Sequence, residues 1–132
     1  MAEDRVETVR SIYEAWAKGD FTAGVELHDP LILLVQSEGF PESGAYLGPE
    51  GMNRYMRTFL EAWEQVTIEA DELTGVGDCV VAEVTQRGVG RGSAAETEFA
   101  YFQVWTFRGE SVIRIDVIRE RDDAFRAAGV TE

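Results

Sequence analysis

The sequence contains a single cysteine, a single histidine and three prolines. A lone cysteine rules out a disulfide within the chain. Free cysteines are among the most buried residue types, so Cys79 is predicted to be a structural thiol in a reducing compartment. His28 has no second histidine or cysteine near it, and zinc-type sites require several such ligands. The sequence therefore predicts neither a metal site nor a bound cofactor.

Basic residues are also scarce. Twelve lysines and arginines stand against 25 acidic residues, which gives a net charge of −13 and an isoelectric point near 4.4. Nucleic acids and anionic membranes both require basic patches, so neither is an expected partner. No apolar run approaches the roughly 20 residues of a membrane helix, and the acidic start of the chain is unlike a signal peptide. A soluble, cytoplasmic protein is expected.

The 132 residues suffice for one domain, predicted to span 1–132, and 45% of them are hydrophobic. Apolar residues recur with helical spacing in the first 18 residues and again after Pro49, whereas the second half of the chain alternates as strands do. The predicted elements, in order, are helices 3–18 and 21–27, strand 31–36, loop 37–48, helix 49–65, strands 67–76 and 79–88, a hairpin over 97–120 and a short helix 121–129.

This order predicts an α+β fold in which a curved, mostly antiparallel sheet holds the helices on its concave side and leaves a pocket between them. The hairpin through Gly109 is apolar on both faces, so both faces must be covered. A homodimer through the sheet is therefore predicted. The residues expected at its interface are Ala100, Phe102, Val104, Ile113, Ile115 and Val117.

Several segments together resemble the nuclear-transport-factor-2-like superfamily, and most closely its SnoaL-like branch, which includes polyketide cyclases and ketosteroid isomerase-like proteins. They are residues 19–21, 27–30, 46–51, 107–110 and 124–129. The resemblance implies a cone-shaped, cystatin-like α+β fold with three helices on the concave face of the sheet, a deep pocket and frequent dimers. Function varies widely on this scaffold, so the fold does not assign it.

The isomerases of this superfamily use a general-base Asp, together with a Tyr and a protonated Asp that donate hydrogen bonds to the oxyanion. In this sequence the position of the general base falls near Gln36, that of the Tyr on Ile12 and that of the protonated Asp on Gln103. Tyr13 is one residue away from the Tyr position. Ordinary steroid isomerisation is therefore not expected. The Arg114-Ile115-Asp116 spacing resembles part of an epoxide hydrolase set but lies on another strand, which leaves that activity an outside alternative.

The resemblance to SnoaL-like cyclases places their acid/base Asp at Asp116, beside Arg114. If Asp116 and Gln103 share the cavity, desolvation raises the pKa of the Asp116 carboxyl and suits it to take a carbon-bound proton. Arg114 then tunes it or holds an oxyanion, while Gln36 and Gln103 orient the polar groups of a small, mostly apolar, carbonyl-bearing substrate. The remaining expected pocket residues are Trp16, Tyr55, Phe59, Tyr101, Trp105 and Ile118.

Two alternatives remain open from the residues alone. Arg114 and Asp116 are neighbours on one strand face and form a structural ion pair in the first alternative. In the second, the protein is a non-catalytic ligand-binding or dimerisation module rather than a cofactor-independent isomerase, cyclase or hydratase. His28, beside Asp29 at a predicted helix end, is interpreted as a cap or core residue.

Overall fold

A computed structural model of the protein describes residues 2–37, 44–92 and 95–129. The chain forms three α-helices, one short 3-10 helix and six strands in these segments. In order they are α1 (Ala2–Ala17), η1 (Val25–Leu27), β1 (His28–Gln36), β2 (Gly44–Leu47), α2 (Gly48–Glu61), β3 (Trp63–Val76), β4 (Cys79–Gly90), β5 (Glu96–Arg108), β6 (Ser111–Ile118) and α3 (Arg121–Ala127).

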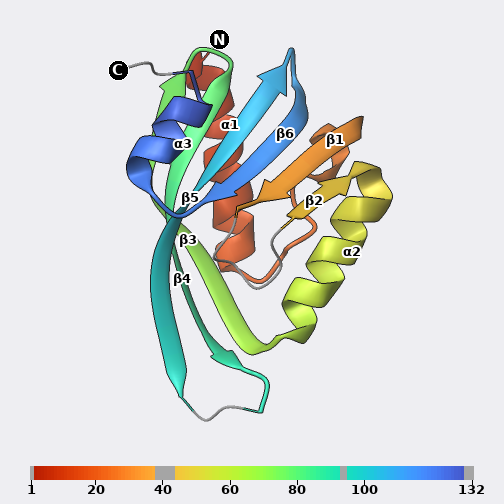
Figure 1. Ribbon diagram of the computed structural model, residues 1–132, viewed down its shortest axis with the longest axis vertical. Coiled ribbons are helices and arrows are strands. Elements are labelled where there is room, and N and C mark those ends of the chain that lie inside the picture. Colours follow the sequence, from red (N-terminus) through yellow and green to blue (C-terminus); the bar gives the residue numbers. More distant parts are fainter. Residues whose placement is uncertain (1, 38–43, 93–94, 130–132) are drawn as a thin grey trace.

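The six strands form one sheet in the order β2-β1-β6-β5-β4-β3. Neighbouring strands are antiparallel except for β1 and β6, which run parallel. Figure 1 shows the sheet strongly curved, with the paired ends of β4 and β5 reaching past the helices. The α+β class and the mostly antiparallel curved sheet predicted from the sequence are confirmed.

The main core lies on one face of the sheet, here called the inner face. Val9, Ile12 and Tyr13 of α1 and Met52 and Tyr55 of α2 are buried there. They pack against inner-face strand residues that include Ile32, Leu34, Val84, Trp105 and Ile115. The helical spacing of apolar residues therefore predicted correctly which side of α1 is buried.

The opposite, outer face carries a second, smaller core beneath α3. Ala124 of α3 is buried in the same cluster as Phe102 and Val104 of β5, and Phe125 packs against it. Of the three α-helices in the described residues, α1 and α2 therefore lie on the inner face, and α3 lies across the sheet from them. The outer-face residues expected to meet a second subunit are in part covered by the chain's own α3.

A β-bulge in β6 decides which residues share a face. Phe107 pairs with Val112, whereas Thr106 pairs with Arg114, so Ile113 is an extra residue on β6. A shift of one residue moves every later side chain of a strand to the other face. Beyond the bulge Val104 therefore pairs with Asp116, and Gln103 pairs with Val117.

Three predicted elements differ in detail from the structure. The expected helix 21–27 is reduced to η1, and the segment expected as a loop contains β2, while residues 38–43 of that loop lie outside the described residues. α2 ends at Glu61 and Trp63 already belongs to β3. Trp63 packs closely on Gly88 of β4, where an added Cβ would come within 2.7 Å of its ring. No described helix is long and apolar enough to cross a membrane.

Candidate functional site

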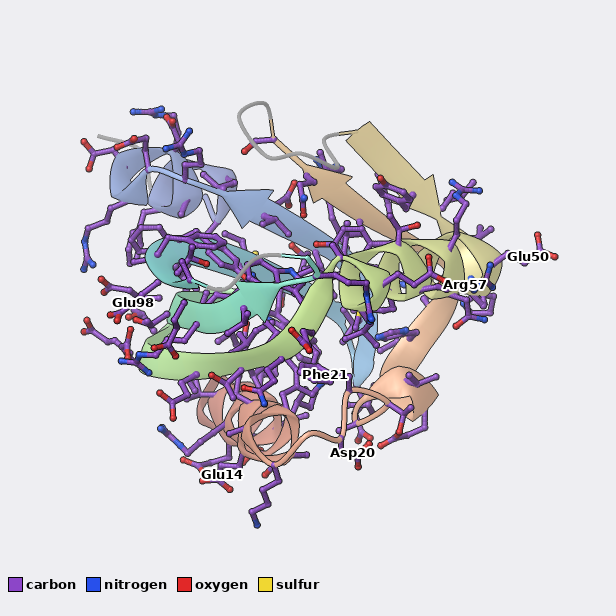
Figure 2. All side chains as sticks on the ribbon, turned by 90° about the horizontal axis from the view of Figure 1, so that it is seen from below. Glu14, Asp20, Phe21, Glu50, Arg57 and Glu98 are labelled. Atoms are coloured by element: carbon purple, nitrogen blue, oxygen red, sulfur yellow. The ribbon has the colours of Figure 1, made fainter. Side chains whose placement is uncertain are left out.

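A cavity of about 170 Å³ lies between the inner face, α1 and α2. Figure 2 shows how Phe21, in the turn after α1, points toward the interior while Asp20 points to solvent. The residues that line the cavity are Trp16, Phe21, Ala23, Val25, His28, Leu34, Pro49, Met52, Asn53, Tyr55, Met56, Phe59, Ile68, Tyr101, Gln103, Trp105 and Ile115.

Aromatic rings form two walls of this cavity. On the α1 side the Trp16 ring lies 5.9 Å from that of Trp105 and 6.1 Å from that of Phe21, centroid to centroid. On the α2 side Tyr55 and Phe59 are stacked, with centroids 6.3 Å apart and planes 17° apart. Such rings prefer offset or edge contacts with other rings, so the walls favour a flat, unsaturated ligand.

A buried hydrogen-bond chain fixes the orientation of the Gln103 amide. The indole Nε1 of Trp105 donates to the Tyr13 hydroxyl at 2.9 Å, and that hydroxyl donates to Oε1 of Gln103. An indole nitrogen can only donate, so the single proton of the Tyr13 hydroxyl must go to the amide oxygen. The NH₂ group of Gln103 is therefore turned away from Tyr13, on a side chain that lines the cavity.

Trp16 offers a second donor. Its Nε1 is buried and makes no hydrogen bond. Every other fully buried side-chain nitrogen or oxygen of the described residues has a hydrogen-bond partner. Leaving such a group unpaired costs about 1–3 kcal/mol. Trp16 lines the cavity, so an acceptor on a bound molecule that displaced the contacts covering this nitrogen would remove that penalty.

Two further tyrosine–glutamine pairs occur on the inner face. Tyr55 donates to Oε1 of Gln36 at 2.6 Å, and Tyr101 donates to Oε1 of Gln86 at 2.8 Å. Burial raises the pKa of the Tyr101 hydroxyl well above its usual value, and it also raises the pKa of Tyr13. Both phenols therefore remain neutral at physiological pH.

His28 is the lining residue that titrates closest to neutrality. Burial lowers the pKa of its imidazole, and the negative charge of Glu26 partly offsets this effect. The ring is therefore predominantly neutral at pH 7. None of the lining residues in the described part of the chain is an Asp, Glu, Lys or Arg.

Asp116 does not line the cavity. It pairs with Val104 on the outer face, whereas Gln103 faces the cavity from the inner face. The predicted placement of these two residues on one cavity is wrong because the bulge at Ile113 shifts the register by one. Without that bulge, Gln103 would have paired with Asp116.

Arg114 and Asp116 form the structural ion pair that was the alternative interpretation. Arg114 Nε lies 3.0 and 3.1 Å from the two carboxylate oxygens, and its second nitrogen lies 3.0 Å from one of them. The carboxylate raises the pKa of the Arg114 guanidinium. Asp116 and Ile118 instead line an open groove on the outer face, beside Ser37 and Asp123.

The same register shift corrects the expected dimer surface. Ile115 and Val117 belong to the inner core, and Phe102 and Val104 lie beneath α3. The interface as predicted therefore does not exist on one face. A homodimer stays a prediction without this surface.

The other expected pocket residues come together. Trp16, Tyr55, Phe59, Tyr101, Gln103 and Trp105 all line the cavity, and Gln36 is bound to Tyr55 just behind it. Sequence reasoning missed Tyr13, which does reach Gln103 although it stands one residue from the position the resemblance gave. It also missed His28 as a lining residue. The three-residue spacing of Tyr13 and Trp16 was the signal that both lie on one helix side.

No cluster of three or more His, Cys, Asp or Glu side chains among the described residues has the arrangement of a metal site. The polar groups at the cavity are instead neutral hydrogen-bonding groups, namely amides, phenols, an imidazole and an indole. Such a set recognises uncharged polar atoms and offers no fixed charge to hold an ion.

A family model for the SnoaL-like domain matches residues 9–115. The chain belongs to this family. No curated protein sequence matches it. The SnoaL-like assignment predicted from the sequence is thereby confirmed.

Solved structures share the fold over nearly their whole length. An NTF2-like protein from Burkholderia thailandensis is 22% identical, with a TM-score of 0.78, and 96% of this chain and 97% of that chain are covered. An NTF2-like protein of unknown function from Burkholderia pseudomallei is 17% identical, with a TM-score of 0.78, covering 98% and 100%.

A third similar structure is a protein from Catenulispora acidiphila with a ketosteroid isomerase-like fold, in complex with trimethylamine. It is 17% identical, its TM-score is 0.73, and 95% of this chain and 94% of that chain are covered. At these identities the likeness shows that the SnoaL-like chain has the NTF2-like fold. The function must be argued from the cavity.

Proposed function

We propose that this SnoaL-like protein binds a small, uncharged aromatic molecule that carries a carbonyl group. The observation that carries the proposal is the buried, unpaired indole Nε1 of Trp16, a residue that lines a cavity whose described polar groups are all uncharged at pH 7. A bound acceptor reaches this nitrogen by displacing the contacts that cover it. A carbonyl oxygen is an acceptor without a proton, which is what a buried N–H donor requires. Gln103 supports the proposal because its amide oxygen is already occupied and its NH₂ group is available.

The size and the walls of the cavity support a single aromatic ring. An engineered cavity of about 150 Å³ in another protein stays dry and binds benzene, and the cavity here is about 170 Å³. Trp16 and Trp105 on one side and Phe59 on the other offer ring faces and edges to the ligand. A benzene ring with one short carbonyl substituent satisfies both the volume and the donors.

The electrostatics of the cavity lining supports an uncharged ligand. Moving an ion out of water without a partner costs several kcal/mol or more. The described lining contains no charged side chain that could compensate a ligand charge, and the chain as a whole carries a net charge of −13. Anionic ligands are therefore disfavoured both at the surface and inside.

The proposal is binding without turnover. The acid/base role considered for Asp116 required it to face the cavity, and it lies on the outer face. The cavity phenol of Tyr101 is held neutral by burial, which raises its pKa. The chemistry that the cavity walls provide is thus hydrogen bonding to a neutral molecule.

A calorimetric comparison of three ligands of nearly equal shape tests the proposal. Acetophenone carries the carbonyl, α-methylstyrene replaces its oxygen by a CH₂ group, and benzoate carries a negative charge. Acetophenone should bind about fivefold more tightly than α-methylstyrene, since one buried hydrogen bond contributes about 1 kcal/mol. Benzoate should not bind measurably.

Equal affinity for acetophenone and α-methylstyrene would contradict the role of the carbonyl. Binding of benzoate as tight as that of acetophenone would contradict the uncharged ligand class. Absence of binding by all three would contradict a ligand-binding function for this cavity.

A further inference from the structure

His28 is a second polar group at the cavity that the proposed function does not use. It opens β1 and its backbone N–H donates to the carbonyl of Val25 in the preceding turn. The side chain is half-buried and lines the cavity. Within the described segments, no hydrogen bond involves its imidazole ring, whereas the neighbouring Asp29 carboxylate is paired with the N–H of Leu31 and with Arg108.

His28 and Gln103 lie at different levels of the sheet. On the shared neighbour β6, His28 is level with Val112 and Gln103 is level with Val117. Counted on β5, the separation is four residues, from Phe107 to Gln103, which corresponds to roughly 13 Å of backbone. Gln103 and His28 therefore reach the cavity at two different levels of the sheet, and the rest of its lining is mostly apolar and aromatic.

The polar groups at these two levels have opposite hydrogen-bonding character. Trp16 and the NH₂ group of Gln103 donate. A neutral imidazole has one ring nitrogen with a free lone pair, which accepts. A molecule that binds to both carries an acceptor at one end and a donor at the other.

We propose that His28 accepts a hydrogen bond from a hydroxyl group of the ligand, so that the site takes hydroxyaryl ketones in their neutral form. The carbonyl oxygen of such a molecule meets Trp16 and Gln103, and its hydroxyl proton meets the His28 ring. This inference rests on the proposed function and adds the second point of recognition. His28 is a specificity-determining residue in this arrangement.

The charged and titratable groups around His28 are consistent with an accepting role at neutral pH. Glu26, in η1, is the charged group that acts on the pKa of His28, and its effect is smaller than that of burial. The lining groups from α2 and β5, which are Asn53, Tyr55 and Tyr101, are uncharged at pH 7. The imidazole thus gains a proton only at acidic pH, and it then ceases to accept.

The inference is tested by comparing the affinities of two ligands for three variants of the protein. The affinities of acetophenone and 4-hydroxyacetophenone are measured by calorimetry at pH 7 for the wild type, His28→Phe and His28→Asn. His28→Phe keeps a ring without an acceptor, and His28→Asn keeps an acceptor. The quantity compared is the ratio of the two affinities within each protein, which cancels any general change in the cavity.

The hydroxyl group should strengthen binding to the wild type by about fivefold to tenfold. This gain should vanish in His28→Phe and should be retained in part in His28→Asn. An equal gain in all three proteins would overturn the inference and leave the proposed function standing. If the wild type binds neither ligand, both the inference and the proposed function fail.

A pH series on the wild type keeps the test decisive if His28→Phe does not fold. As the pH falls from 7 through the lowered pKa of His28, the gain from the hydroxyl group should decline, while the affinity for acetophenone stays constant. Both ligands remain neutral over this range, so only the protein titrates. A hydroxyl gain that is unchanged once the His28 imidazole is protonated, as followed by its own NMR signals, would overturn the inference.

Discussion

Tyr13 of α1 and Gln103 of β5, 90 residues apart in the sequence, are joined by a buried hydrogen bond in which the tyrosine hydroxyl donates to the amide oxygen. The bond connects the first helix to the centre of the sheet. It also turns the amide NH₂ group of Gln103 away from Tyr13. One interaction thus contributes to the stability of the fold and to the polarity of the cavity.

Replacing Gln103 by leucine should lower the free energy of unfolding by about 2 kcal/mol, because the buried Tyr13 hydroxyl loses its acceptor. Tyr13→Phe should also destabilise, since Nε1 of Trp105 then loses its own acceptor. Urea unfolding of both single variants and the double variant measures the coupling. Strictly additive losses would contradict a direct bond, because residues in contact show interaction energies of about 0.5–3 kcal/mol.

Trp16→Phe should separate ligand binding from stability. The variant keeps an aromatic ring but removes a buried donor without a partner, so its melting temperature should be unchanged or higher. Its affinity for acetophenone should fall by about fivefold to tenfold. Trp63→Phe is the matched control, because Trp63 packs on Gly88 and does not line the cavity. A loss of affinity in the control but not in Trp16→Phe would refute the role given to Trp16.

Asp116→Asn should leave acetophenone binding unchanged and lower the free energy of unfolding by about 1 kcal/mol. The loss is modest because Arg114 is half-exposed and water replaces the carboxylate as its partner. Thermal melts and calorimetry on the same preparation check both parts. Abolished binding in a stable Asp116→Asn variant would show that Asp116 takes part in the site after all.

The buried phenols predict a loss of stability in alkali. Burial raises the pKa values of Tyr13 and Tyr101 in the folded state, so the folded protein keeps protons that the unfolded chain releases above about pH 10. Their contribution is therefore complete below pH 10 and declines as the pH rises further. Each group should reduce the free energy of unfolding by about 1.4 kcal/mol per pH unit above that point.

Urea unfolding between pH 9 and pH 11 measures this slope. The variant Tyr101→Phe lacks one of the two phenols and should show a shallower decline than the wild type. An identical decline in both proteins would assign the alkaline instability to other groups.

Much of the fold was accessible from the sequence because it depends on patterns that repeat. The apolar spacing of α1 and the alternation of the later strands place most inner-face residues correctly, including Trp16, Gln103 and Trp105. The amphipathic α2 likewise brings Tyr55 and Phe59 to the cavity. These assignments need only the period of each element.

The position of Asp116 was not accessible because it depends on a single inserted residue. Nothing in the pattern of β6 marks Ile113 as the extra residue, yet the bulge there sends Asp116 to the outer face and Val117 to the inner face. The orientation of Tyr13 depends in turn on the angle at which α1 crosses the sheet, which packing sets. The sequence pattern therefore predicts most of the residues that line the cavity. The register between β5 and β6 determines which polar residues face it.

The indole N–H resonances of the three tryptophans provide the most direct test of the central claim. In protein labelled with ¹⁵N-tryptophan, the Trp16 signal is identified by its absence in Trp16→Phe, and acetophenone is then titrated into the wild type. The Trp16 indole proton should move downfield as it gains a hydrogen bond to the carbonyl, and α-methylstyrene should not produce this shift. A Trp16 signal that acetophenone at saturation leaves in place, or that both ligands move equally, would contradict recognition of a carbonyl group by this cavity.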